Sequence, residues 1–346
     1  MADLRPTPKR GDGERGQLLL IAAFIIAVSF VVLALVVNSA IFTENLATRD
    51  DVAGSGEALE YRHEVSQTVG EVLTAINQNN SIDTADQEDV LENNVGQISL
   101  QGGIQQSTRG GFVKVPNGSM STESGKKVAQ DTPREFSNTT ADSSADPSGN
   151  SWEVVENVES TRNLKINVTN LGALSLTTTD PFEMELDNGT DTWRMNISGS
   201  STPAGTLVTV GIESENVGSW ESCSRVTDDG YITIDVTRGL VGGEPCHALT
   251  QLSDGTDMWF GLENTYSIEF INFNNIEGTY SFIIDDGSSA ADRDNFGNDG
   301  TSDVSNTDHD PYIREAIYSA SVPYSYYTPD TGYETQIEVA PGEVPE

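Results

Sequence analysis

The chain of 346 residues has few basic residues and very few cysteines, and each scarcity excludes a class of protein. Lys and Arg together number 18 against 54 Asp and Glu, which gives a formal net charge of −36. Nucleic-acid binding needs a basic surface, so no nucleic-acid partner is predicted. With only 2 cysteines the chain is no disulfide-rich scaffold.

Recognisable catalytic patterns are also missing. The 3 histidines are scattered along the chain. No nucleophile elbow, zinc-protease motif, phosphate-binding loop or dinucleotide fingerprint occurs. Acidic pairs abound, but among 54 carboxylates they indicate no particular site. We therefore predict neither an enzyme nor a bound cofactor.

The acidic residues are spread over the whole chain rather than gathered in one tail. Such a charge would repel itself at ordinary ionic strength. In molar salt the Debye length falls to about 3 Å, and the repulsion is screened. The composition therefore favours adaptation to a hypersaline medium, with an ordinary acidic secreted protein as the alternative.

One long apolar run lies near the N-terminus, from Leu18 to Val37, with Ser29 as its only polar residue. As a helix it would span about 30 Å, the thickness of a bilayer's hydrocarbon core. It also lacks the polar stripe of a globular helix. We predict a transmembrane helix over 17–38. Basic residues within the leader 1–16 place the N-terminus in the cytoplasm and the bulk of the chain outside the cell membrane.

Arg15, Gly16 and Gln17 stand directly before this apolar run. They resemble the class III signal of archaeal pilins and archaellins. In those families a peptidase cuts after a basic–Gly pair on the cytoplasmic side, and the apolar helix is retained. The resemblance implies a cut between Gly16 and Gln17. An uncleaved anchor and a secretory cut near residues 38–40 are the alternatives.

Helical spacing of apolar residues follows the run, with Leu59, Val65, Val69 and Leu73 among its members. This spacing predicts a helix from about residue 57 to 77, and a shorter helix is expected over about 85–94. We interpret 39–100 as a helical stalk. Residues 101–150 are rich in Gly, Ser, Thr, Asn and Asp, which predicts a flexible linker with one short strand at 111–115.

Strict alternation of apolar and polar residues begins after Trp152. Asn188-Gly189, between two alternating segments, is a strong hairpin signal. A period of two places one face of each strand inward, and several short strands with turns favour an antiparallel β-sandwich over 151–346. The alternating segments are 164–169, 182–187, 193–198, 232–236, 266–270 and 280–284, with further strands at 313–327 and 332–339. The predicted fold class is α+β: a single transmembrane helix and helical stalk, then a β-sandwich-like extracellular domain.

Cys223 and Cys246 flank the strand predicted at 231–236. Outside the cell a disulfide is the expected state of such a pair, and we predict one here. The alternatives are two separate buried thiols or a metal site shared with His247.

An acidic insert at 285–310 interrupts the strands. Its oxygen ligands suit calcium, but Phe296 stands where the third ligand of an EF-hand loop belongs. A solvated loop is therefore the favoured interpretation. The candidate ligands are Asp292, Asp294, Asn298, Asp299 and Asp303. Sequons for N-glycosylation occur at Asn79, Asn117, Asn138, Asn167, Asn188 and Asn196.

The two ends of the chain, residues 14–50 and 316–343, resemble those of haloarchaeal membrane-anchored, pilin-like surface proteins. The resemblance implies anchoring, surface exposure and contact with copies of itself or other pilin-like subunits through the N-terminal helix. We predict a non-enzymatic structural or adhesive subunit of the cell surface. A monomeric membrane-tethered binding module for sugars or cations is the alternative, and a tethered hydrolase comes third.

Overall fold

A computed structural model gives the fold of the chain. It describes residues 56–80, 82, 84–108, 110–116, 119–138, 150–170, 180–215, 218, 220–250, 265–285, 289–290, 296, 310–329 and 332–342. Within these ranges the fold is α+β, with two helices followed by two antiparallel sheets. No helix in this described part is long and apolar enough to cross a membrane. The leader 1–16 and the predicted transmembrane helix 17–38 lie outside it.

The first described helix covers residues 56–78, as its apolar spacing predicts. A short 3-10 turn, η1 (Thr84–Asp86), then leads into α2 (Gln87–Ser107). This second helix continues well beyond the predicted end near residue 94. Gly102 does not end it, because this glycine lies against the first helix, where a Cβ would collide with the Tyr61 hydroxyl. Close helix packing therefore outweighs the low helix propensity of glycine.

A nine-stranded antiparallel sheet has the order β1-β15-β2-β13-β4-β9-β10-β11, with β16 paired to β15. Strand β15 is long enough to pair with β2 along its first part and with β1 and β16 along its last part. The strands are β1 (Phe112–Lys114), β2 (Ser121–Glu135), β4 (Thr161–Val168), β9 (Ile232–Asp235), β10 (Leu240–Val241), β11 (Glu244–Pro245), β13 (Glu277–Asp285), β15 (Tyr312–Tyr327) and β16 (Gly332–Val339).

A seven-stranded antiparallel sheet has the order β14-β3-β12-β5-β6-β7-β8. The hairpin predicted at Asn188-Gly189 is confirmed as the β5–β6 turn, where Gly189 has a φ of 78°. The strands are β3 (Ser151–Val158), β5 (Phe182–Asp187), β6 (Thr192–Thr202), β7 (Gly205–Ser214), β8 (Glu221–Thr227), β12 (Tyr266–Ile271) and β14 (Ser289–Ala290). Two 3-10 turns, η3 (His247–Leu249) and η4 (Phe273–Asn275), complete the described elements.

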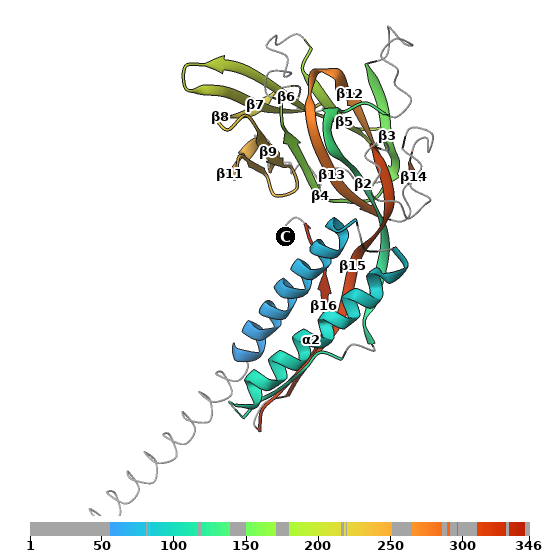
Figure 1. Cartoon of the computed structure of the whole chain (residues 1–346), viewed down its shortest axis with the longest axis vertical. Coiled ribbons are helices and arrows are strands. Elements are labelled where there is room, and N and C mark those ends of the chain that lie inside the picture. The colour runs from blue at the N-terminus through green and yellow to red at the C-terminus, as the bar shows by residue number, and fades with distance from the viewer. Residues whose placement is uncertain are drawn as a thin grey trace, which may run out of the picture.

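The two sheets share one core, which we call the sandwich lobe (upper part of Figure 1). Its centre is a cluster of rings from both sheets. Phe270 of the seven-stranded sheet lies edge-on to Tyr280 of the nine-stranded sheet, with ring centroids 5.1 Å apart. Phe182 meets the rings of Phe136 and Phe270 at 5.3 and 5.4 Å. The alternation in the sequence thus buries one face of each sheet, as expected.

The two helices form a second core with β1, β16 and the last part of β15, which we call the helical lobe. Figure 1 shows both helices lying along these strands in the lower part of the molecule. Val69 and Leu73 of the first helix, Leu91 of α2 and Tyr324 of β15 are all buried there. The predicted stalk is described only from residue 56 on, and there it is packed on the sheet rather than free-standing.

The linker predicted over 101–150 needs a larger correction, because it contains the end of α2 and the long strand β2. The short strand predicted at 111–115 is confirmed as β1. Strand β2 lies between β15 and β13 in the nine-stranded sheet. Its buried positions include Lys127 and Gln130, which hydrogen-bond to Asn80 and to the carbonyl of Gly278. Because hydrogen-bonded polar residues occupy buried positions of β2, its sequence lacks the alternation of apolar and polar residues that predicts a strand. Residues 139–149 lie outside the described part.

Candidate functional site

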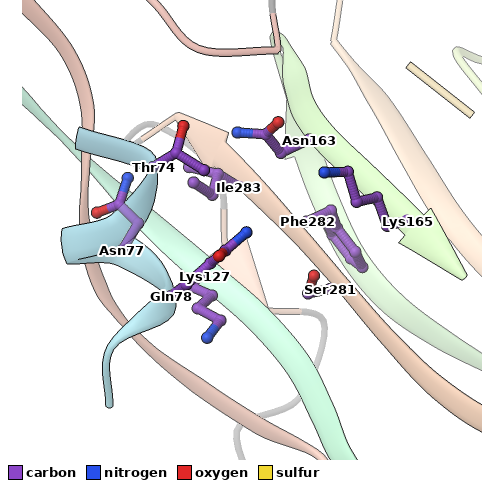
Figure 2. Close-up of a pocket in the computed structure, with 9 residues that line it drawn as sticks. All are labelled: Thr74, Asn77, Gln78, Lys127, Asn163, Lys165, Ser281, Phe282 and Ile283. Atoms are coloured by element: carbon purple, nitrogen blue, oxygen red, sulfur yellow. The ribbon is translucent and has the colours of Figure 1, made fainter. Parts of the chain in front are cut away.

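A cleft lies where the end of the 56–78 helix meets the outer face of the nine-stranded sheet (Figure 2). Its volume is about 20 Å³, room for one water molecule, so the cleft is a shallow hollow. Side chains from the helix, β2, β4 and β13 line it, so it joins the helical lobe to the sandwich lobe. The lining residues are Thr74, Asn77, Gln78, Lys127, Asn163, Lys165, Ser281, Phe282 and Ile283.

The cleft has an unusual charge for this chain, because none of its lining residues carries a carboxylate. Two of the chain's few lysines, Lys127 and Lys165, line it together with three amides and two hydroxyls. The Lys165 amine is 3.7 Å from a carboxylate oxygen of Asp235. Amines, amides and hydroxyls suit a neutral polar ligand or an anion, whereas two amines without a lining carboxylate are unfavourable for a divalent cation.

Lys127 is the more enclosed of the two amines. Burial lowers its pKa, and the nearby carboxylate of Asp131 partly offsets that shift. Its Nζ donates to Oδ1 of Asn80 at 3.1 Å and lies 5.6 Å from the ring centre of Tyr312. These contacts give the amine a structural role beside the cleft.

The helix end at this cleft is fixed by side chains that bond to the sheet backbone. The Asn77 amide donates to the carbonyl of Ile317 at 2.8 Å and accepts from its N–H at 3.0 Å. Arg314 of β15 donates to Asn80 Oδ1 and to the carbonyl of Ile82. The buried amide of Asn77 thereby satisfies two backbone groups of β15. The cleft is consequently a rigid junction between the two lobes.

The predicted disulfide between Cys223 and Cys246 is confirmed, with the two Cα atoms 5.7 Å apart. It joins β8, at the edge of the seven-stranded sheet, to the residue that follows β11 of the nine-stranded sheet. Arg225 reinforces the link by donating to the carbonyl of Pro245 at 2.7 Å and pairing with Glu244 at 3.0 Å. A disulfide of this kind fits a domain outside the reducing cytoplasm.

The calcium ligands proposed within the acidic insert, Asp292 to Asp303, all lie outside the described residues. In the described part no group of three or more His, Cys, Asp or Glu side chains could hold a metal ion. Phe296 is described, and it is buried against Trp152 with ring centroids 5.6 Å apart. Packing therefore accounts for a phenylalanine at this place in the insert.

The sequons fall in different surroundings, and their glycosylation stays a prediction. Asn79 is exposed just after the first helix, and Asn188 is in the β5–β6 turn. The amide of Asn167 donates to Thr279 and accepts from Thr233. Asn138 and Asn196 are half-buried, and the side-chain oxygen of Asn196 accepts a hydrogen bond from the Gly211 N–H at 3.1 Å. Asn117 lies outside the described residues. The processing residues Arg15, Gly16 and Gln17 also lie outside them.

A row of charged side chains crosses the outer face of the seven-stranded sheet. Pairing places Glu153 opposite Glu269, Glu269 opposite Glu185, and Arg194 between Glu185 and Glu213. The carboxylates of Glu153, Glu269 and Glu185 are therefore neighbours, and Arg194 is next to Glu185 at one end of the three. Like charges on directly paired residues destabilise a sheet at low salt.

The cleft and this row were both missed by sequence reasoning. The cleft combines residues from four segments that are far apart in the sequence, such as Thr74, Lys165 and Ser281. The row depends on which strands are neighbours, and alternation alone does not give the strand order. The one signal in the sequence is the rarity of lysine, of which two out of five residues line the cleft.

These features define a two-lobed α+β protein whose antiparallel sheets are joined by a disulfide. The model of one protein family, described as a family of unknown function (DUF7261), matches residues 12–144. The match includes the predicted anchor region, both helices, β1 and β2, and the remaining strands fall beyond it. No curated protein and no solved structure matches the chain.

Proposed function

We propose that the chain is a non-enzymatic cell-surface protein, held in the cytoplasmic membrane by its N-terminal apolar helix. The observation that carries this proposal is the apolar run from Leu18 to Val37, which contains no charged residue and follows a leader with basic residues. The Cys223–Cys246 disulfide supports an extracytoplasmic position for the domain that follows.

The arrangement of the two lobes fits such an anchor. The described chain starts at residue 56, at the end of the helical lobe that is far from the sandwich lobe (Figure 1). A membrane helix upstream of residue 56 would leave the helical lobe near the bilayer and the sandwich lobe projecting outward. The finer role we propose is that of a pilin-like structural or adhesive subunit of a haloarchaeal surface, on the resemblance of residues 14–50 and 316–343.

Fractionation of the producing cells at molar salt tests the anchor. The full chain should sediment with membranes and enter the supernatant only with detergent. Its mature mass should begin at Gln17, and a Gly16→Phe variant should keep the leader while remaining in the membrane. Recovery of the full chain in the soluble fraction without detergent would overturn the anchor. Unchanged processing of Gly16→Phe would leave the anchor but exclude the pilin-type cut.

A membrane-tethered binding module is the second candidate, in which the shallow cleft would contact only part of a ligand lying on the surface. The amines, amides and hydroxyls of the cleft support a neutral polar or anionic ligand, such as a sugar, in preference to a cation. Thermal unfolding of the detergent-solubilised full chain with glucose, glucuronate or calcium checks this candidate. A rise in melting temperature with a sugar, lost in Lys165→Gln and kept in the remote Lys114→Gln control, would support binding. A shift with calcium alone would exclude the cleft.

A further inference from the structure

The two helices of the helical lobe have very different exposed faces. The 56–78 helix exposes six ionisable side chains, which are Glu57, Glu60, Arg62, His63, Glu64 and Glu71. From Asn93 to Thr108, α2 exposes none. Its outward positions there are Asn93, Asn94, Gln97, Leu100, Gln101, Ile104, Gln105, Ser107 and Thr108. We call these nine positions the neutral face of α2.

The neutral face includes two large aliphatic side chains that the described chain does not cover. Leu100 is 59% exposed and Ile104 is 61% exposed, one turn apart on the helix. The opposite side of α2 is the packed one, with Leu91, Val95 and Gly102 buried in the helical lobe. Turning the helix to bury Leu100 and Ile104 would therefore expose an existing core. Exposed aliphatic residues among uncharged polar ones are typical of an interface.

The charge of the chain narrows the choice of partner. A basic partner would be attracted to the carboxylate-rich surfaces, such as the row containing Glu153 and Glu269, rather than to a neutral face. Two copies of a chain with a net charge of −36 would have to strip water from carboxylates wherever these face each other, and this cost remains when molar salt screens their repulsion. They can approach closely where both present neutral side chains, and the neutral face of α2 is such a surface.

We propose that the neutral face of α2 is the contact between two copies of this chain, related by a two-fold axis. In such an isologous contact the same surface serves both subunits. Gln97, Gln101 and Ile104 recur at helical spacing along the middle of the face and would lie nearest the axis. The stretch from Asn93 to Thr108 is about 23 Å long, four turns of helix.

The contact is too small to hold two free molecules together. A stable interface buries about 800 Å² on each partner, which one helix face of this length does not reach. Tethering in one membrane confines the copies to a plane and raises their effective concentration, so that a weak contact can be occupied. The inference therefore rests on the proposed anchor, and the C-terminal end of α2 lies at the same end of the helical lobe as residue 56 (Figure 1).

Cysteine crosslinking of the full chain in its own membranes at molar salt tests the contact. Both native cysteines are engaged in the disulfide, so an added cysteine gives a defined signal. Gln101→Cys should form a dimer under copper-phenanthroline oxidation, at least tenfold more than Gln67→Cys on the charged 56–78 helix. Adding Ile104→Glu to Gln101→Cys should reduce the dimer at least tenfold, while Ile104→Leu should retain it.

Each other outcome is decisive. Equal dimer yields at Gln101→Cys and Gln67→Cys, or a yield that Ile104→Glu leaves unchanged, would overturn the contact. Protection of Gln101→Cys from a membrane-impermeant maleimide without any dimer would show that lipid or another protein covers the face, and would overturn it as well. Fractionation of the same samples separates the two proposals: chain found in the soluble fraction overturns the anchor, whereas membrane-bound chain without an Ile104-dependent dimer overturns the contact alone.

Discussion

The two lobes share the strand β15 but stabilise it in different ways. In the sandwich lobe two sheets enclose a cluster of aromatic rings, and a disulfide joins them at one side. In the helical lobe the last part of β15 packs on two helices through Val322, Tyr324 and aliphatic side chains. Strict alternation is confined to the last part of β15, from Ser319 to Tyr326, where the helices cover one face of the strand. In its first part three successive residues, Ala316 to Tyr318, are buried, so the burial pattern changes where the strand passes from one lobe to the other.

The outer surfaces differ as much as the cores. The sandwich lobe presents a row of carboxylates, whereas the helical lobe presents the neutral face of α2. Hydrated carboxylates favour solubility of the sandwich lobe, because burying them against a neighbour would cost desolvation free energy. The neutral face lacks that protection, so contact between molecules is expected at the helical lobe. If the proposed contact forms, association takes place at the neutral face of α2, while the carboxylate row and the charged 56–78 helix stay in solvent.

The largest effect is expected from truncating the ring cluster. Phe270→Ala removes a fully buried ring that contacts Phe136, Trp152, Phe182 and Tyr280. The loss should be about 3–5 kcal/mol of unfolding free energy. Denaturant unfolding of the solubilised full chain at molar salt, with hydrogen exchange read by mass spectrometry, measures it.

Two further variants compare this loss of stability with that of a core residue in the helical lobe and with that of an exposed residue. Leu91→Ala should cost about 2–4 kcal/mol and release exchange mainly in the helices, β1 and β16. Tyr231→Ala, at a residue that is 56% exposed, should change stability by less than about 0.5 kcal/mol. If Leu91→Ala also deprotects β5 to β7, the two lobes unfold as one unit and their comparison as separate cores is wrong.

Removing the disulfide should have the next largest effect. Cys223 and Cys246 are 23 positions apart, so closing this loop stabilises by about 3 kcal/mol in the chain-entropy picture. The double variant Cys223→Ser, Cys246→Ser should lose that amount, with increased exchange in β8 and β11. Reduction of the wild-type chain by a membrane-permeant reductant should give the same change and none in the double variant. A loss below about 1 kcal/mol would show that Arg225 and the surrounding packing hold β8 without the bond.

A smaller effect is expected where the helix joins the sheet. Asn77→Leu keeps the size of the side chain but leaves the N–H and carbonyl of Ile317 without their partner. Unsatisfied buried groups should cost about 1–3 kcal/mol, and the loss should concentrate in the helical lobe. Gln67→Leu on the exposed side of the same helix serves as the control. Equal stability of both variants would mean that water replaces the amide at Ile317.

The sequence predicts the sandwich strands well because their burial is regular. Leu164, Phe182 and Trp193 open alternating runs that the structure confirms as β4, β5 and β6. It fails at β2, where buried Lys127 and Gln130 take the place of apolar residues. Burial of such residues depends on Asn80 and Gly278, which lie in other segments, so the local pattern contains no trace of it.

The candidate site was less predictable than the fold. The disulfide could be predicted because two cysteines leave one pairing, and the structure confirms it. The cleft could not, because Asn77 and Lys165 come together only through the strand order and the angle of the first helix. The neutral face of α2 can be identified only from the sequence and the packing together. The uncharged stretch 93–108 is visible in the sequence, but only the packing of Gly102 shows which side of α2 remains outside.

The smallest effect concerns the carboxylate row and depends on pH. Glu183 lies beside that row with 20% of its side chain exposed, 3.4 Å from Arg194. Burial raises its pKa, Arg194 lowers it, and the carboxylates of Glu185 and Glu213 raise it. Since the net shift is upward, the folded protein binds the proton more tightly than the unfolded chain does. Stability from this group is therefore fully present at acid pH and is lost as the pH rises through the raised pKa.

Glu183→Gln removes the loss of stability that ionisation of Glu183 causes as the pH rises. The variant should be more stable than wild type at pH 7 by a few tenths of a kcal/mol, and the difference should vanish or reverse at acid pH, where Glu183 is protonated. Thermal unfolding of the full chain from acid to neutral pH checks this, with the exposed Glu64→Gln as the control. The advantage should shrink between low and molar salt, because screening weakens the repulsion within the row. A variant less stable than wild type at neutral pH would show instead that the Arg194 ion pair outweighs burial, and that the sandwich surface is stabilised by its charges.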